Sequence, residues 1–121
     1  HALVAPDLDA ASLGTATMRD FWILADSVGR LDHGVWCNVG SAVIMPEVFL
    51  KALTVARNLG ARARGFSTAV FDMNVHYRPT QNVRLRPTQD GGKGYYFVGH
   101  HEIMIPLLAA WIRRTIRKGS I

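Results

Sequence analysis

The chain is poor in cysteine and in long apolar runs. Cys37 is its only cysteine, so an internal disulfide is excluded and we expect a reducing, cytoplasmic compartment. It lies in a strand-like apolar run, which favours a structural thiol over a nucleophile. The longest apolar run, from Ile103 to Ile112, is about ten residues long, whereas a membrane-spanning helix needs about 20. These absences argue against a disulfide-rich secreted domain and against a membrane protein.

Several familiar site motifs are also missing. The sequence has no three-glycine dinucleotide fingerprint, no Gly-Lys-Ser/Thr phosphate loop and no His/Cys pattern with metal-ligand spacing. His100 and His101 are neighbours, and adjacent side chains of a strand point to opposite faces, so they do not form a chelating pair. We therefore predict no metal site.

What is present is an apolar and basic chain. Apolar residues make up 49% of the 121 residues and charged residues 19%, which is typical of a globular domain and favours contacts between subunits. The net charge is +5, and most of the 14 basic residues are arginines, whose guanidinium groups bind phosphates and carboxylates. We expect a homo-oligomer with an anionic partner, either a nucleotide-like small molecule or nucleic acid.

A single domain is predicted over residues 1–121, with an irregular lead-in over residues 1–14. A domain of this length buries roughly two-thirds of the surface of its unfolded chain, so one core is feasible. The first six residues have no initiator methionine and no periodic pattern. We expect that they mark a processed end or a cut through a larger protein.

Hydrophobic periodicity predicts an α/β fold. Apolar residues recur at helical spacing after Thr15 and after Pro46, whereas short apolar runs are typical of buried strands. The predicted elements are a helix from residue 15, a strand at 35–39, a helix at 46–59, a strand at 66–73, a loop at 75–88 with a short edge strand at 82–85, a strand at 95–98 and a helix at 102–118. A strand, a helix and a strand in succession should form a right-handed unit with parallel strands. The sequence thus indicates a short, mainly parallel sheet with three main helices.

A turn of small residues joins the first strand to the second helix. Asn38, Gly40 and Ser41 lie at the carboxyl end of this strand, where open α/β sheets bind ligands and where helix amides can meet a phosphate. A nucleotide cofactor is one interpretation of this layout. A purely structural turn is an equally good one, because such turns occur wherever a strand meets a helix.

The segment after the second strand carries a second polar group. His76, Tyr77 and Arg78 could hold an anion or polarise a carbonyl, with Asp72 or Asn74 orienting the histidine. The alternative is a solvated loop in which the arginine pairs with a carboxylate. We favour a site, because many polar groups converge at one edge of the sheet.

The segment before the last helix carries a third group, His100, His101 and Glu102. We expect one of the two histidines to reach the turn at Gly40 and the glutamate to support the amino end of the helix. The helix ends in a basic cluster, for which a solvated helix end is favoured over binding to nucleic acid or to an acidic membrane. Aromatic residues are not interleaved with these charges, and no recognised nucleic-acid motif is present. The cluster consists of Arg113, Arg114, Arg117 and Lys118.

Six blocks of sequence, within residues 16–110, carry a resemblance to a known family. They are NVGSAVIMPEVFLKAL at 38–53, FDM at 71–73, HYRP at 76–79, NV at 82–83, GKGY at 92–95 and GHHEIMIPLL at 99–108. Together they resemble the carboxyl-terminal part of uncharacterised bacterial proteins related to deoxyhypusine synthase. The resemblance implies a Rossmann-like, three-layer α/β fragment of the type that binds NAD between the subunits of a homo-oligomer.

Two departures limit what the resemblance implies. The family's proteins are considerably longer, and the amino-terminal part of their domain has no counterpart here, which implies a truncated part of a nucleotide-binding domain. The synthase's catalytic lysine motif is missing, because Lys51 and Lys93 stand in unrelated contexts. Deoxyhypusine synthesis is therefore not predicted.

Two functions from different classes follow. The first is an NAD-type nucleotide-binding module of unknown activity, and the second is a non-catalytic homo-oligomeric domain whose basic surface binds acidic partners or nucleic acid. The residues predicted for the first are Asn38, Gly40, Ser41 and Asp72 at the cofactor, His76, His100, His101 and Glu102 as catalytic residues, and Tyr77, Arg78 and Lys93 at the substrate.

Overall fold

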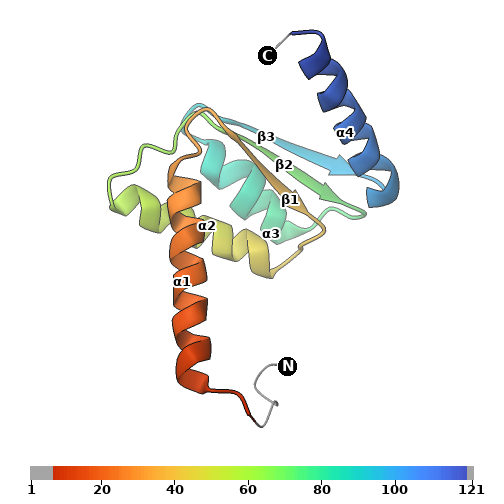
Figure 1. Ribbon diagram of the computed structural model, residues 1–121. Helices are drawn as coiled ribbons and strands as arrows, with labels where there is room; N and C mark the ends of the chain where they lie inside the picture. Colours follow the sequence, from red (N-terminus) through yellow and green to blue (C-terminus); the bar gives the residue numbers. More distant parts are fainter. Residues whose placement is uncertain (1–6, 120–121) are drawn as a thin grey trace.

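A computed structural model describes residues 7–119 of the chain as a mixed α/β fold (Figure 1). Its elements are α1 (Ala10–Gly29), β1 (Val35–Val39), α2 (Ile44–Asn58), β2 (Ser67–Asp72), α3 (Tyr77–Pro79), η2 (Thr80–Leu85), η3 (Arg86–Thr88), β3 (Lys93–Val98) and α4 (His101–Arg117). The short helices α3, η2 and η3 follow one another as one helical stretch. The predicted fold class, a Rossmann-like α/β fragment, is confirmed.

The three strands form one sheet in the order β1-β2-β3, and both pairings are parallel. Paired residues project to the same face of a sheet, and successive residues project to opposite faces. Val70 and Phe71 of the central strand therefore point to opposite faces. The positions that share a face with Phe71 are Val35, Cys37 and Val39 of β1, Ser67 and Ala69 of β2, and Lys93, Tyr95 and Phe97 of β3.

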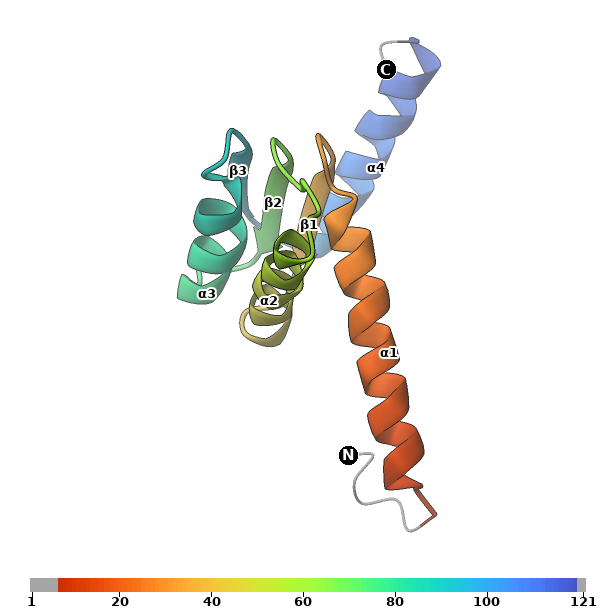
Figure 2. The same ribbon diagram turned by 90° about the vertical axis from the view of Figure 1, so that its left-hand side faces the viewer.

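The face that carries Val70 is covered by α2 and by the helical stretch that begins with α3, and Figure 2 shows both on the same side of the sheet. The core lies between these layers. Trp36 stacks on Phe49, with ring centroids 4.3 Å apart. α1 packs against α2, and its Ala25 and Val28 are buried in the same core. The largest buried apolar side chains are those of Phe49, Leu53, Phe66, Val70 and Val83.

The opposite face of the sheet is largely bare. Val35, Val39, Tyr95 and Phe97 on this face are between 44% and 62% exposed. α4 starts at the carboxyl end of the sheet and rises on this side (Figure 2), but none of its residues is buried. Within residues 7–119, the third layer of the fold thus consists of α4 alone.

Both long terminal helices extend away from the sheet (Figure 1). On α1, Met18 and Trp22 are 53% and 49% exposed, and on α4, Leu107 and Trp111 are 65% and 68% exposed. No helix of the described chain is both long and apolar enough to cross a membrane.

The segment between β2 and β3 differs from the prediction. The sequence predicts a loop at 75–88 with an edge strand at 82–85, and both predictions are wrong because this segment is mostly helical. Pro79 lies in the first turn of the stretch, where a missing amide hydrogen costs little. Asn82 is buried and its Nδ2 donates to Glu47 Oε1 at 2.8 Å. Pro79 is therefore part of a helix start, and Asn82 makes a buried contact, instead of both lying in a loop.

α1 begins earlier than the sequence predicts. Of the expected lead-in, residues 1–6 lie outside the described part of the chain, and the helix already starts at Ala10. The carboxylate of Asp9 caps the helix by accepting bonds from the amides of Ala11 and Ser12, at 3.1 Å each. A bond from the Ser12 hydroxyl, followed by these amide bonds, lowers the pKa of Asp9. The predicted start was too late because clear apolar periodicity begins only at Met18.

Candidate functional site at the carboxyl edge of the sheet

Three chain segments meet where the parallel strands end. The amide of Gly40, just after β1, donates to the carbonyl of Phe71 at 2.9 Å. The amide of Gly99, just after β3, donates to the carbonyl of Asp72 at 3.0 Å. Hydrogen bonding between the segments therefore continues past the ends of the outer strands, and the backbone of this edge is held in place.

His101, the first residue of α4, lies against the turn after β1. Its Nε2 is 3.1 Å from the carbonyl oxygen of Phe71. A carbonyl oxygen only accepts hydrogen bonds, so Nε2 carries a hydrogen and Nδ1 is the ring atom left for a ligand. Gly40 has a φ of 66°, and a Cβ there would lie 3.4 Å from Cε1 of His101. One of the two neighbouring histidines thus reaches Gly40, as the sequence predicts.

Asn38 and Ser41 hold the turn between β1 and α2. Asn38 is 3% exposed, and its Nδ2 donates to the carbonyl of Ser41 at 2.9 Å. The Ser41 hydroxyl oxygen accepts from the amide of Met45, in the first turn of α2, at 3.3 Å. Both side chains have the structural role that the sequence left open as an alternative. The hydroxyl hydrogen of Ser41 can still donate to a ligand.

Asp72 and His76 form a pair at the end of the central strand. Asp72 is 7% exposed, and its Oδ1 accepts from the amide of Asn74 at 3.2 Å. His76 Nε2 lies 3.5 Å from the same carboxylate oxygen, while its side chain remains 40% exposed. The carboxylate and the imidazole thus lie within ion-pair distance of each other.

Tyr96 supports this pair and was missed by the sequence reasoning. Its hydroxyl accepts from the amide of His76 at 3.1 Å and donates to the carbonyl of Asn74 at 2.9 Å. The one available signal was strand alternation, because Tyr95 and Tyr96 must point to opposite faces and only one of them can reach the helix-covered side. Tyr96 therefore fixes the backbone that carries the histidine.

The residues predicted to bind substrate are not brought together. Arg78 Nε lies 3.3 Å from Oε1 of Glu47, which is the carboxylate pairing that the sequence left open as an alternative. Tyr77 is 74% exposed at the start of α3. Lys93 begins β3 and pairs in register with Ser67, so it lies at the amino edge of the sheet, opposite to the turn after β1.

His100 and Glu102 flank the first residue of α4. His100 is the N-cap residue and its side chain makes no capping hydrogen bond, while Glu102 lies in the first turn, where its charge complements the helix dipole. No three His, Cys, Asp or Glu side chains within residues 7–119 lie close enough together to hold a metal ion. The structure thus makes two separate contacts at this edge, that of His101 with Gly40 and that of His76 with Asp72, and His100 and Glu102 are the sequence neighbours of His101.

The groove nearest this edge is apolar. It lies between the bare face of the sheet and α4 and has a volume of about 460 Å³. Phe71 and Phe97 at its floor are stacked, with ring centroids 5.0 Å apart. We call it the α4 groove, and its lining residues are Phe71, Phe97, Met104, Leu107, Leu108 and Trp111.

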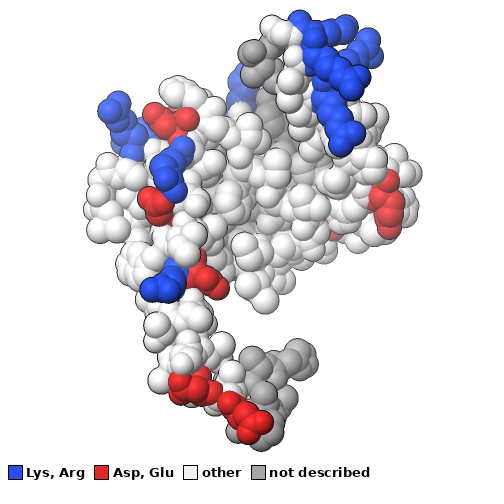
Figure 3. All heavy atoms as spheres, viewed as in Figure 1, with Lys and Arg blue, Asp and Glu red and all other residues white. Residues whose placement is uncertain are grey.

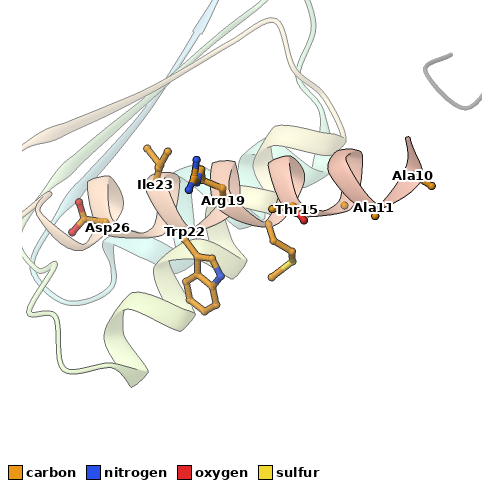
Figure 4. Close-up of a pocket in the computed structure, with 9 residues that line it drawn as sticks. Ala10, Ala11, Thr15, Arg19, Trp22, Ile23 and Asp26 are labelled. Atoms are coloured by element: carbon orange, nitrogen blue, oxygen red, sulfur yellow. The ribbon is translucent and has the colours of Figure 1, made fainter. Parts of the chain in front are cut away.

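A larger hollow of about 850 Å³ lies along the outer face of α1. Figure 4 shows the residues that line it, among them Thr15, Trp22 and Ile23, and all of those described belong to this one helix. A single helix face does not enclose a small molecule. We therefore interpret this hollow as exposed helix surface, not as a ligand site.

Cys37 should react slowly with alkylating reagents. The thiol is exposed on the bare face of the sheet, but partial burial by its neighbours raises its pKa, so the reactive thiolate is scarcer at a given pH than for an ordinary cysteine. We expect iodoacetamide to label the folded protein more slowly at pH 7 than the protein unfolded in urea, with the difference narrowing as the pH rises past the raised pKa. Mass spectrometry of timed samples measures both rates. Equal rates at pH 7 would contradict the prediction.

Comparison with known proteins found no relative: no protein-family model, no curated protein and no solved structure matches the chain. The resemblance to proteins related to deoxyhypusine synthase stays a prediction from the sequence blocks.

Proposed function

We propose that this chain binds a nucleotide of the NAD type at the carboxyl edge of its sheet. The observation that supports this best is the position of His101, which is bonded to the carbonyl of Phe71 and lies against Gly40. It joins the start of α4 to the turn before α2. Together with Asp72 and His76, it places polar groups from three segments at the edge where open α/β sheets bind ligands.

The start of α2 can supply one donor to a phosphate. Its N-cap residue, Val43, makes no side-chain capping bond. The amide of Met45 donates to Ser41 Oγ and Pro46 has no amide hydrogen, so the amide of Ile44 is the donor left at this helix start, where amides attract anions. Glu47 in the same turn opposes an anion, but its ion pair with Arg78 offsets its charge, and Asn82 donates a hydrogen bond to its carboxylate. In this proposal His101 contacts the cofactor through Nδ1. His76, oriented by Asp72, is the candidate general acid or base for a substrate.

Isothermal titration calorimetry with NAD⁺ and NADH tests the proposal. Ser41→Trp fills the turn after β1 and should weaken binding at least about tenfold, which corresponds to about 1.4 kcal/mol. Lys93→Gln is the matched control, because this residue lies at the opposite edge, and it should leave the affinity unchanged. Circular dichroism confirms that both variants fold. The proposal fails if neither form of the cofactor binds or if Ser41→Trp binds as well as the unchanged protein.

A non-catalytic, self-associating domain is the second candidate function. The observation that favours it is the bare sheet face together with α4, which has no buried residue. Apolar surface of this kind marks protein contacts. The basic cluster gathers at the end of α4, as Figure 3 shows in blue, and would face acidic partners. Self-association without any heat of cofactor binding would favour this function over the first.

A further inference from the structure

α4 needs a partner that the described chain does not provide. It is a 17-residue helix with no buried residue. Isolated helices of about this length are marginal in water, because most helix stability in proteins comes from packing an apolar face. The face that lines the α4 groove carries Met104, Leu107, Leu108 and Trp111 at helical spacing. Something apolar and elongated should therefore fill the groove beside it.

The amino half of α1 has a matching unpaired face. Met18 and Trp22 continue the stripe by which Ala25 and Val28 pack into the core, but they are 53% and 49% exposed. The amino half of α1 extends away from the sheet (Figure 1). Ala11 and Thr15 extend the same stripe toward the start of the helix with small side chains. Among residues 7–119, α1 thus offers a ridge of apolar and small side chains that no other element covers.

The two helices also carry complementary charge. Before Arg19, the only charged residues of α1 and its lead-in are Asp7 and Asp9. From Ile103 onward, the chain has no acidic residue, and its last turns carry the basic cluster. Figure 3 shows acidic side chains at the start of α1 and basic ones at the end of α4. An antiparallel pairing of α1 with α4 brings these opposite charges together.

The spacing along both helices agrees with such a pairing. Asp9 and Trp22 are 13 positions apart, and so are Met104 and Arg117, so each pair spans about 20 Å of helix. Antiparallel alignment places the aspartate beside the arginine and the tryptophan beside the methionine. The bulky Trp111 then faces the small side chains near Thr15.

We propose that α1 of a second copy of this chain docks antiparallel in the α4 groove. Within one chain the two helices extend to opposite ends of the molecule (Figures 1 and 2), so its own α1 does not reach the groove. In a two-fold dimer each chain gives one α1 and receives another, which closes the assembly. The inserted helix also covers Phe97, which is 44% exposed on the bare face. This inference rests on the proposed self-association but not on nucleotide binding.

Disulfide trapping between two single-cysteine proteins tests the register. In a Cys37→Ser background, Met18→Cys and Leu108→Cys fall opposite each other in the alignment. After subunit exchange and mild oxidation, the mixture should give a covalent dimer of twice the 13.4 kDa chain mass, whereas each protein alone gives little. Ala16→Cys mixed with Leu108→Cys is the matched control, because this exposed alanine lies on the other side of α1, and it should crosslink poorly.

Light scattering of variants with reversed charges completes the test by measuring the dimer dissociation constant. Arg117→Glu should raise the dimer dissociation constant about fivefold, because the alignment places Arg117 beside Asp9. Asp9 caps α1, so the neighbouring Asp7→Lys is the added change, and it should restore part of the affinity. Two outcomes overturn this interface but leave self-association in place. In the first, Leu108→Cys gives more covalent dimer by itself than in the mixture with Met18→Cys. In the second, the control pair gives as much covalent dimer as the test pair. A monomer at all concentrations overturns both, whereas the cofactor titration decides nucleotide binding separately.

Discussion

Phe49→Ala is expected to lower the free energy of unfolding by about 3–5 kcal/mol. Phe49 is fully buried, stacks on Trp36 and meets Phe66 edge-on with ring centroids 6.4 Å apart. Removing it leaves a cavity between α2 and the sheet that these neighbours cannot fill. Because domains of this kind have a total stability of only about 5–15 kcal/mol, the variant should be largely unfolded under mild conditions.

Urea denaturation followed by circular dichroism measures this loss. Leu59→Ala is the control, because Leu59 is 74% exposed at the end of α2 and its truncation should change stability by no more than about 0.5 kcal/mol. If the two variants unfold at the same urea concentration, Phe49 is not in the core that we describe.

Gly94→Ala is expected to cost about 3 kcal/mol or more, at the upper end of the range for overpacking. A Cβ at this position would lie 2.0 Å from the carbonyl oxygen of Arg84 and 2.8 Å from its carbonyl carbon. Both are backbone atoms of η2, so the helical stretch or β3 would have to move as a whole. The variant should therefore separate two elements that pack directly on each other.

Gly14→Ala is the matched control for this substitution. Gly14 lies within α1, and a Cβ there meets nothing within 4 Å, so the alanine should stabilise the protein by about 1 kcal/mol through its higher helix propensity. Thermal melting at the same protein concentration compares the two. The melting temperature should fall for Gly94→Ala and rise for Gly14→Ala. An unchanged melting temperature for Gly94→Ala would mean that β3 and η2 lie further apart than described.

The strands and the helix between them could be predicted from the sequence. The apolar run around Cys37 is typical of a strand, and the periodic segment after Pro46 is typical of a helix. A strand, a helix and a second strand in succession predict that the two strands are parallel. Local periodicity also located the last helix to within one residue at each end. These elements are determined by residues close to one another in the sequence.

The helical stretch between β2 and β3 could not be predicted in the same way. Its Pro79 and Pro87 normally end helices, and its polar residues are typical of loops. What makes the segment helical is tertiary: Asn82 is bonded to Glu47 of α2, and Val83 is buried in the core. Such contacts join residues far apart in the chain, so no local sequence pattern predicts them.

Only part of the candidate site could be predicted, because some of its contacts also join residues that are far apart in the sequence. Strand ends alone place Gly40 and Asp72 at one edge, because parallel strands finish together. The contact between His101 and Gly40 was expected only as one of two choices, since the helix start that orients the ring depends on where α4 begins. Arg78 has a carboxylate partner in another element, which its own surroundings in the sequence do not reveal.

The strand order has a consequence for where a ligand crevice can open. The strands follow one another in chain order, and both crossovers lie on the same face, so the described sheet contains no topological switch point. In open α/β sheets the crevice opens where the winding direction reverses. Gly40 follows β1, whose outer edge is unpaired within residues 7–119. A strand that came after β3 in the order of connections and paired with this edge would reverse the winding beside Gly40, whereas one that came before β1 would continue it.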